Sequence, residues 1–244
     1  MSFDSKNFDP EFEKAIIEML DEDGPVLPIT QMGEPVLRAQ TVPYDGQLSR
    51  KTLDRLVEAM RETMYKAPGV GLAGPQIGLN LSIAVLEDHV RSSSGGWADE
   101  DERAEASAAA ESAEASESES AEAADPREIG ELPFHVILNP SYVPVGDKTA
   151  SFYEGCLSFK GYQAVRKRWL DIDATWTDED GRIHTERLHG WAARIFQHET
   201  DHLSGEVYID KAEIRSLTND ENLMEYWCYD PIPSEAAEVL GFEL

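Results

Sequence analysis

The stretch His198-Glu199-Thr200-Asp201-His202 is the part of the sequence that best indicates both the fold and the chemistry of this protein. It lies in a segment from about Gly190 to Leu203 that we expect to be an α-helix. Residues four apart on a helix project from the same face, so His198 and His202 can hold one divalent metal. Glu199 lies beside them and can act as a general base on a water at that metal. The stretch therefore indicates a metal-dependent hydrolase.

Such a site needs a third protein ligand and an open position for water. In one common HExxH pattern this ligand is a histidine six residues after the second one, but Tyr208 stands there. In another pattern it is a glutamate on a later helix, for which Glu221 and Glu225 are candidates. Upstream, Cys156 offers a thiolate, which suits zinc or ferrous iron. The residues alone leave these alternatives open.

A glycine-rich run, Gly69-Val70-Gly71-Leu72-Ala73-Gly74-Pro75-Gln76-Ile77-Gly78, is the third chemical element. It lacks the Lys-Ser/Thr ending of a phosphate-binding loop. Closely spaced glycines let a backbone approach a ligand. The Gln76 amide adds a neutral donor that can hydrogen-bond a developing oxyanion.

The charge and the composition exclude several classes of function. The 244 residues carry a formal net charge of -27, which argues against direct nucleic-acid binding because phosphates require clustered Lys and Arg. No stretch approaches the roughly 18 apolar residues of a membrane helix, and the acidic N-terminus does not resemble a signal peptide. We therefore expect a cytoplasmic protein with no membrane contact, whose Cys156 and Cys228 are free thiols.

The pattern of short strands followed by a late helix predicts the α+β class. Expected helices begin near Pro10 and at Ser49–Tyr65, Gly190–Leu203 and Asn219–Cys228; expected strands are Leu81–Leu86, Phe134–Leu138, Leu170–Trp176, Arg182–Leu188 and Glu206–Ile209. Residues 1–25 are expected to form an N-terminal helical extension, 26–211 a catalytic domain and 212–244 a helical acidic tail. Residues 91–128, rich in Ala, Ser and Glu, are predicted to be a disordered acidic insertion.

Taken together and in this order, three motifs resemble those of peptide deformylases. They are the run Gly69–Gln76, then Glu154-Gly155-Cys156-Leu157-Ser158, then Gln197-His198-Glu199-Thr200-Asp201-His202-Leu203. The segment Gly33–Arg38 also looks like the family's N-terminal segment, and the resemblance covers about Val26 to Lys211 without the insertion.

The resemblance implies antiparallel sheets around a central helix that bears HExxH. It implies hydrolysis of the formyl group from the N-terminal formyl-methionine of new polypeptides, and a transient ribosome contact becomes an expectation. By motif match, Cys156, His198 and His202 would hold the metal. The family's usual ion is ferrous iron, for which zinc, nickel or cobalt can substitute.

The resemblance also implies roles for residues around the metal. Glu199 would move the protons, while the Gln76 amide and the Leu157 backbone N–H would stabilise the oxyanion. Backbone around Val70 and Gly71 would pair with the extended peptide. The walls of the methionine pocket are expected to include Val70 and Trp191.

The chain departs from the family pattern at two of these places. Gly74 stands where the family usually has Ala, which we expect to add flexibility beside Gln76. Gln163 stands where many relatives have a peptide-anchoring Arg, and Arg166 and Arg168 are the candidates to replace it. An HExxH endopeptidase with a downstream Glu ligand and a non-catalytic relative remain the alternative functions.

Overall fold

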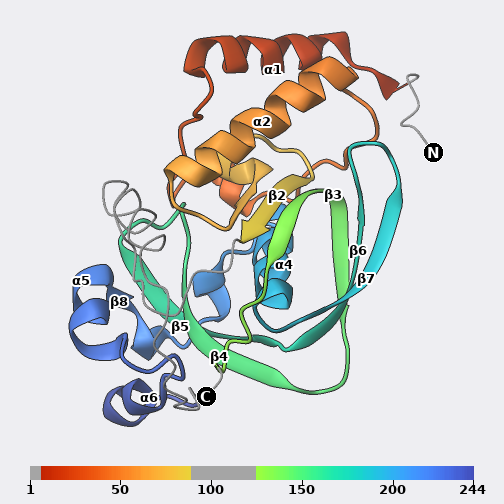
Figure 1. Cartoon of the computed structure of the whole chain (residues 1–244). Helices are drawn as coiled ribbons and strands as arrows, with labels where there is room; N and C mark the ends of the chain where they lie inside the picture. The colour runs from red at the N-terminus through yellow and green to blue at the C-terminus, as the bar shows by residue number, and fades with distance from the viewer. Residues whose placement is uncertain (1–6, 89–124) are drawn as a thin grey trace, which may run out of the picture.

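Two antiparallel sheets with a helix between them organise this protein, whose computed structural model describes residues 7–88 and 125–244 (Figure 1). The larger sheet has the order β1 (Gly71–Ala73), β2 (Ile83–Asp88), β3 (Leu132–Pro144), β6 (Asp171–Thr177), β7 (Ile183–His189). The smaller sheet has the order β4 (Thr149–Gly155), β5 (Tyr162–Trp169), β8 (Thr218–Asn219). The helices are α1 (Pro10–Asp23), α2 (Arg50–Lys66), α4 (Gly190–Leu203), α5 (Asp220–Asn222) and α6 (Ser234–Leu240). Short helical turns are η2 (Pro35–Arg38), η3 (Gly74–Ile77), η4 (Tyr208–Lys211), η5 (Ile214–Ser216) and the π-helical η6 (Leu223–Trp227).

Helices α1 and α2 pack against each other on one side of the larger sheet, far from α5 and α6 (Figure 1). The side chain of Asp9 caps α1 by accepting hydrogen bonds from two backbone N–H groups of its first turn. Glu13 of α1 then accepts hydrogen bonds from Ser49 N at 2.7 Å and Thr52 Oγ1 at 2.8 Å, at the start of α2. The N-terminal helix therefore helps to cap the next helix, and its Ile16 and Leu20 are buried in the same core.

Helix α4 carries the His198–His202 stretch and packs against strands of both sheets. Its apolar residues join a core that includes Ile172, Trp176 and Phe196. Gln197 ties the helix to the end of β5: its Oε1 accepts from Trp169 N at 3.1 Å and its Nε2 donates to Trp169 O at 2.8 Å. The orientation of α4 is thus fixed by packing and by paired backbone hydrogen bonds.

The α+β prediction is confirmed, and four of the five expected strands overlap β2, β3, β6 and β7. The predicted strand Glu206–Ile209 is wrong, because a 3-10 turn begins at Tyr208 and the Asp210 carboxylate accepts a hydrogen bond from Val207 N. Most of the predicted insertion lies outside the described residues; only its last four residues, 125–128, fall within them. No helix in the described ranges has the length and apolar character needed to span a bilayer.

Candidate metal centre

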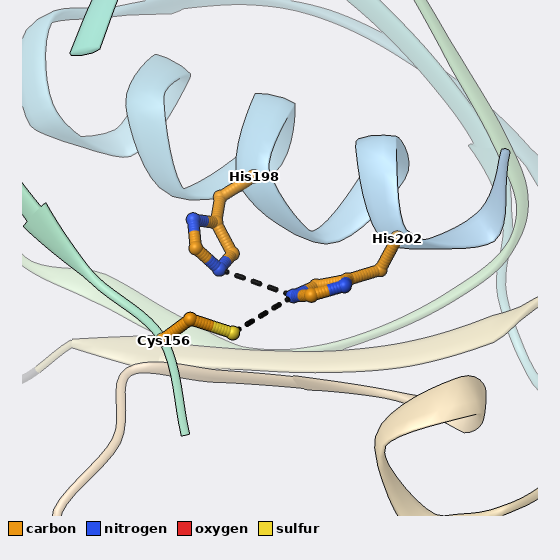
Figure 2. A group of neighbouring side chains, drawn as sticks. All are labelled: Cys156, His198 and His202. Atoms are coloured by element: carbon orange, nitrogen blue, oxygen red, sulfur yellow. Dashed lines mark hydrogen bonds between the residues drawn. The ribbon is translucent and has the colours of Figure 1, made fainter. Parts of the chain in front are cut away.

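Two histidines of α4 meet a cysteine from a distant part of the sequence at the inner face of this helix (Figure 2). His198 and His202 project from α4 towards Cys156, which follows the last residue of β4. The Cys156 Sγ lies 3.3 Å from His202 Nε2, which lies 3.2 Å from His198 Nε2. All three ligand atoms are within 4.8 Å of one another. Within the described ranges, this is the one such group of His, Cys, Asp or Glu.

The chemistry of this group fits a divalent transition metal. The three atoms lie so close together that, without a metal, they compete for one proton. A shared cation would instead accept a lone pair from each of the two imidazole Nε2 atoms and from the sulfur. The set of one thiolate and two imidazoles suits ferrous iron or zinc. Burial lowers the pKa of His202 well below its usual value, so its imidazole is neutral and available as a ligand. The site therefore has the ligand count and donor types of a three-ligand catalytic metal site.

Glu154 orients His198 from behind. Its Oε1 accepts from His198 Nδ1 at 2.5 Å, which leaves Nε2 directed at the ligand group. Burial alone would raise the pKa of Glu154, but the Arg168 and His198 charges hold that pKa well below its usual value. Burial alone would lower the pKa of His198, but hydrogen bonds to Cys156 and Glu154 raise it, so metal binding at Nε2 displaces a proton.

Glu199 lies beside the ligands and is 4% exposed. Burial raises its pKa to about 7, which is well matched to accepting and returning a proton at neutral pH. Its Oε2 is buried and has no hydrogen-bond partner among the described residues. A buried carboxylate oxygen without a partner indicates a place for a group that the protein itself does not supply.

Gln76 is fixed in one orientation by the turn in which it lies. Its Oε1 accepts from Ala73 N at 2.7 Å, so its Nε2 points to the Cys156 Sγ, 3.6 Å away. The carbonyl of Leu157 accepts from Gln31 Nε2 at 3.0 Å, and none of the described residues accepts a hydrogen bond from the Leu157 N–H. The structure therefore places two donors, one side chain and one backbone, next to Cys156.

Of the residues expected to contact a peptide, Gly71 lies against Glu199, and Trp191 lies on α4 seven residues before His198. Val70 and Gly71 lie at or next to β1, an edge strand of the larger sheet, and Val70 O accepts from Glu87 N at 3.0 Å. Val70 and Trp191 are half-buried and both pack against the core that surrounds α4. An edge strand next to a metal centre can accept an extended peptide as an additional strand.

Neither arginine proposed to replace Gln163 is available to a peptide. Arg168 is 4% exposed and pairs with Glu154 at 2.6 Å and with Asp201 at 2.8 Å. Arg166 is 5% exposed and pairs with Glu206 at 2.6 Å. The expectation that either would anchor the substrate is wrong, because both guanidinium groups serve buried ion pairs.

The downstream glutamates also lie elsewhere. Glu221 and Glu225 are exposed and do not belong to the ligand group, whereas Cys156 does. Sequence reasoning missed the roles of Glu154 and Arg194, which touches the same carboxylate at 2.9 Å. Two signals in the sequence could have indicated them: an acid two residues before Cys156, and a cation one helical turn before His198.

Comparison with known proteins places this arrangement in a family. Residues 26–217 match the family model described as "Polypeptide deformylase". The chain is 64% identical over 219 residues to "Peptide deformylase 1" of Bifidobacterium longum, covering 90% of this chain and 88% of that protein. It is 62% identical over 219 residues to "Peptide deformylase" of Bifidobacterium adolescentis, with the same coverage. The crystal structure of a peptide deformylase from Thermotoga maritima superposes with a TM-score of 0.55 at 28% identity, covering 76% of this chain and 97% of that one.

Proposed function

The chain belongs to the peptide deformylase family and removes N-terminal formyl groups, and we propose that it does so at a metal held by Cys156, His198 and His202. The family is metal-dependent. The convergence of one sulfur and two imidazole nitrogens within 4.8 Å is the observation that carries the proposal. We propose ferrous iron as the native ion, with zinc, nickel or cobalt as substitutes, because thiolate and imidazole ligands suit all of them.

A metal held by Cys156, His198 and His202 would supply Lewis-acid activation of water at neutral pH. Glu199 accepts a proton from the water as the water oxygen bonds to the formyl carbon, and it returns a proton to the departing amine nitrogen. The C–N bond breaks, and formate and a free N-terminal amine result. The Gln76 Nε2 and the Leu157 N–H donate hydrogen bonds to the oxyanion that develops on the formyl oxygen.

We propose that substrates are N-formylated nascent peptides, whose backbone pairs with the edge of β1 around Val70 and Gly71. Val70 and Trp191 would form part of the apolar wall around the methionine side chain. Residues 26–211 would form the catalytic domain in the cytoplasm, with a transient ribosome contact. The acidic stretch 218–244 contains no Lys or Arg, so this contact would not be made by that stretch on RNA.

The test uses anaerobically purified protein loaded with Fe²⁺, and it measures formate release from a formyl-Met-Ala-Ser peptide. We expect release by the wild type, and a metal-loaded protein without activity would refute the function. Metal analysis of Cys156→Ser should show loss of the ion, while Cys228→Ser, at the exposed second cysteine, should retain it. Metal retained in Cys156→Ser would refute the assigned ligand set.

A further inference from the structure

Arg194 lies one turn before His198 on α4, so both side chains project from the same helix face. The residue is 4% exposed. Its Nη1 donates to Glu154 Oε2 at 2.9 Å and to Arg166 O at 3.0 Å, and its Nη2 donates to Ala150 O at 2.6 Å. The guanidinium group thus joins the metal-bearing helix to β4 and β5 and ends on the carboxylate that holds His198.

Arg168 contacts both oxygens of Glu154, whereas His198 and Arg194 each contact one of them. Oε1 accepts from His198 Nδ1 at 2.5 Å and from Arg168 Nη2 at 2.6 Å. Oε2 accepts from Arg168 Nε and from Arg194 Nη1, both at 2.9 Å. Two guanidinium groups on one carboxylate fix both its position and its plane. Because Oε1 is the acceptor for His198, the plane of Glu154 determines the plane of the imidazole.

Two aromatic rings hold the Arg194 guanidinium in turn. Its Cζ lies 5.0 Å from the ring centre of Phe152 and 5.9 Å from that of Trp191. These contacts exclude water from the pair with Glu154 and favour a planar cation over a lysine ammonium. The carboxylate therefore has little freedom to rotate or to find solvent as an alternative partner.

We propose that Arg194 is a positioning residue of the metal centre: it fixes Glu154 so that the His198 imidazole presents Nε2 to the metal. The proposal rests on the proposed metal site. Outer groups that orient a metal-binding histidine typically contribute 10- to 100-fold to metal affinity. Arg194 touches neither the metal ligands nor the reacting atoms, so its effect on the metal passes through Glu154.

A purely structural role is the competing explanation, since Arg194 also binds two backbone carbonyls. A double-mutant cycle separates the two roles. The variants are Arg194→Met, Glu154→Gln and the double variant, and the probe is Co²⁺ added to metal-stripped protein. Co²⁺ affinity is measured by competition with a chromophoric chelator, the ligand geometry by the visible absorption spectrum, and stability by urea unfolding.

We expect Arg194→Met to weaken Co²⁺ binding by roughly 10- to 100-fold and to alter the spectrum when Glu154 is present. In the Glu154→Gln background the same change should have less than about a threefold effect on affinity, although it should still lower stability. Equal losses of affinity in both backgrounds, or a variant with wild-type affinity and spectrum, would overturn the proposal.

Arg166→Met is the matched control, because Arg166 is also a buried arginine but pairs with Asp201 and Glu206. It should lower stability and leave the Co²⁺ spectrum unchanged; an altered spectrum would overturn the claim that the effect is specific to Arg194.

If Arg194→Met does not fold, Arg194→Lys keeps the charge and should give an intermediate affinity, so wild-type affinity there overturns the proposal. Formate release is assayed separately: wild-type protein that binds Co²⁺ without releasing formate refutes the proposed function alone.

Discussion

A side chain at Gly71 would collide with Glu199: a Cβ atom there would lie 2.6 Å from Cδ and 2.7 Å from Cγ of Glu199. The carboxylate therefore fills the space that any other residue at position 71 would need. Gly71→Ala should push Glu199 away from the metal ligands and lower kcat by roughly 100-fold, the lower end of a general base's contribution. Steady-state assays with a formyl-Met peptide and metal analysis check this.

Metal content should stay near the wild-type value in Gly71→Ala, because the ligands lie elsewhere. Gly130→Ala is the control, since a Cβ there meets nothing within 4 Å. Unchanged activity in Gly71→Ala would contradict the assignment of Glu199 as the group that moves the proton.

Replacing Gln76 with Glu should keep its hydrogen bond with Ala73 N and remove the donor that points to Cys156. The new carboxylate can still accept from Ala73 N, but it has no donor to replace the Nε2 that points to Cys156. Loss of one oxyanion donor lowers kcat by about 100- to 1,000-fold in comparable sites. We expect that loss in kcat, with little change in KM. A rise in KM at constant kcat would show that Gln76 binds substrate instead.

The glycine at position 74 is closely packed against backbone atoms. A Cβ there would lie 2.7 Å from Leu81 O and 3.1 Å from Leu79 O, both backbone atoms. Gly74→Ala, which would restore the family's usual residue, should therefore lower the free energy of unfolding by about 1–3 kcal/mol. Urea unfolding of both proteins measures this. Equal stability would mean that the Leu79–Leu81 backbone moves aside at low cost.

Removal of the metal should destabilise the protein. A ligand that binds only the folded state at a free concentration 100 times its Kd stabilises it by about 2.7 kcal/mol. Wild-type protein should therefore melt at a lower temperature after treatment with a chelator, in scanning calorimetry. Cys156→Ser should show almost no response to the chelator, and a response of wild-type size would point to a metal site elsewhere.

His189, at the start of α4, should give stability that depends on pH. Hydrogen bonds to Asp171 and Glu128 raise the pKa of His189 above its usual value. The stabilisation is therefore complete below about pH 6.5 and disappears as the pH rises through the higher folded-state pKa. The difference in urea midpoint between wild type and His189→Gln should shrink from pH 5 to pH 9. A difference that grows with pH would contradict the ion pair.

Much of the fold can be predicted from the local spacing of residues in the sequence. Helical spacing predicts α2 and α4. Strands β4 and β5 were not predicted, because β5 reads as polar: Arg166 and Arg168 occupy buried positions where a strand normally places apolar residues. Their partners, Glu154, Asp201 and Glu206, lie in other parts of the chain, so the compensation is invisible before folding.

The candidate site was also predicted only in part from the sequence. The motifs indicated Cys156, His198 and His202 because each stretch has a distinctive spacing, and the fold brings them together. The mistaken use of Arg166 or Arg168 as a peptide anchor came from treating an arginine as free to reach outward. Only the tertiary structure shows that carboxylates of the protein already hold both guanidinium groups.

The amide of Gln197, bonded at both ends to the backbone of Trp169, limits how the centre can be transplanted. A designer who copies His198, Glu199 and His202 onto another helix obtains two ligands and a base, but not the hydrogen bonds that fix the orientation of the helix and of His198. The portable unit has to include the end of β5, which receives Gln197 and contributes Arg168 to the carboxylate behind His198. The smallest piece that can be moved between scaffolds is therefore a helix with its neighbouring strand, not a five-residue signature.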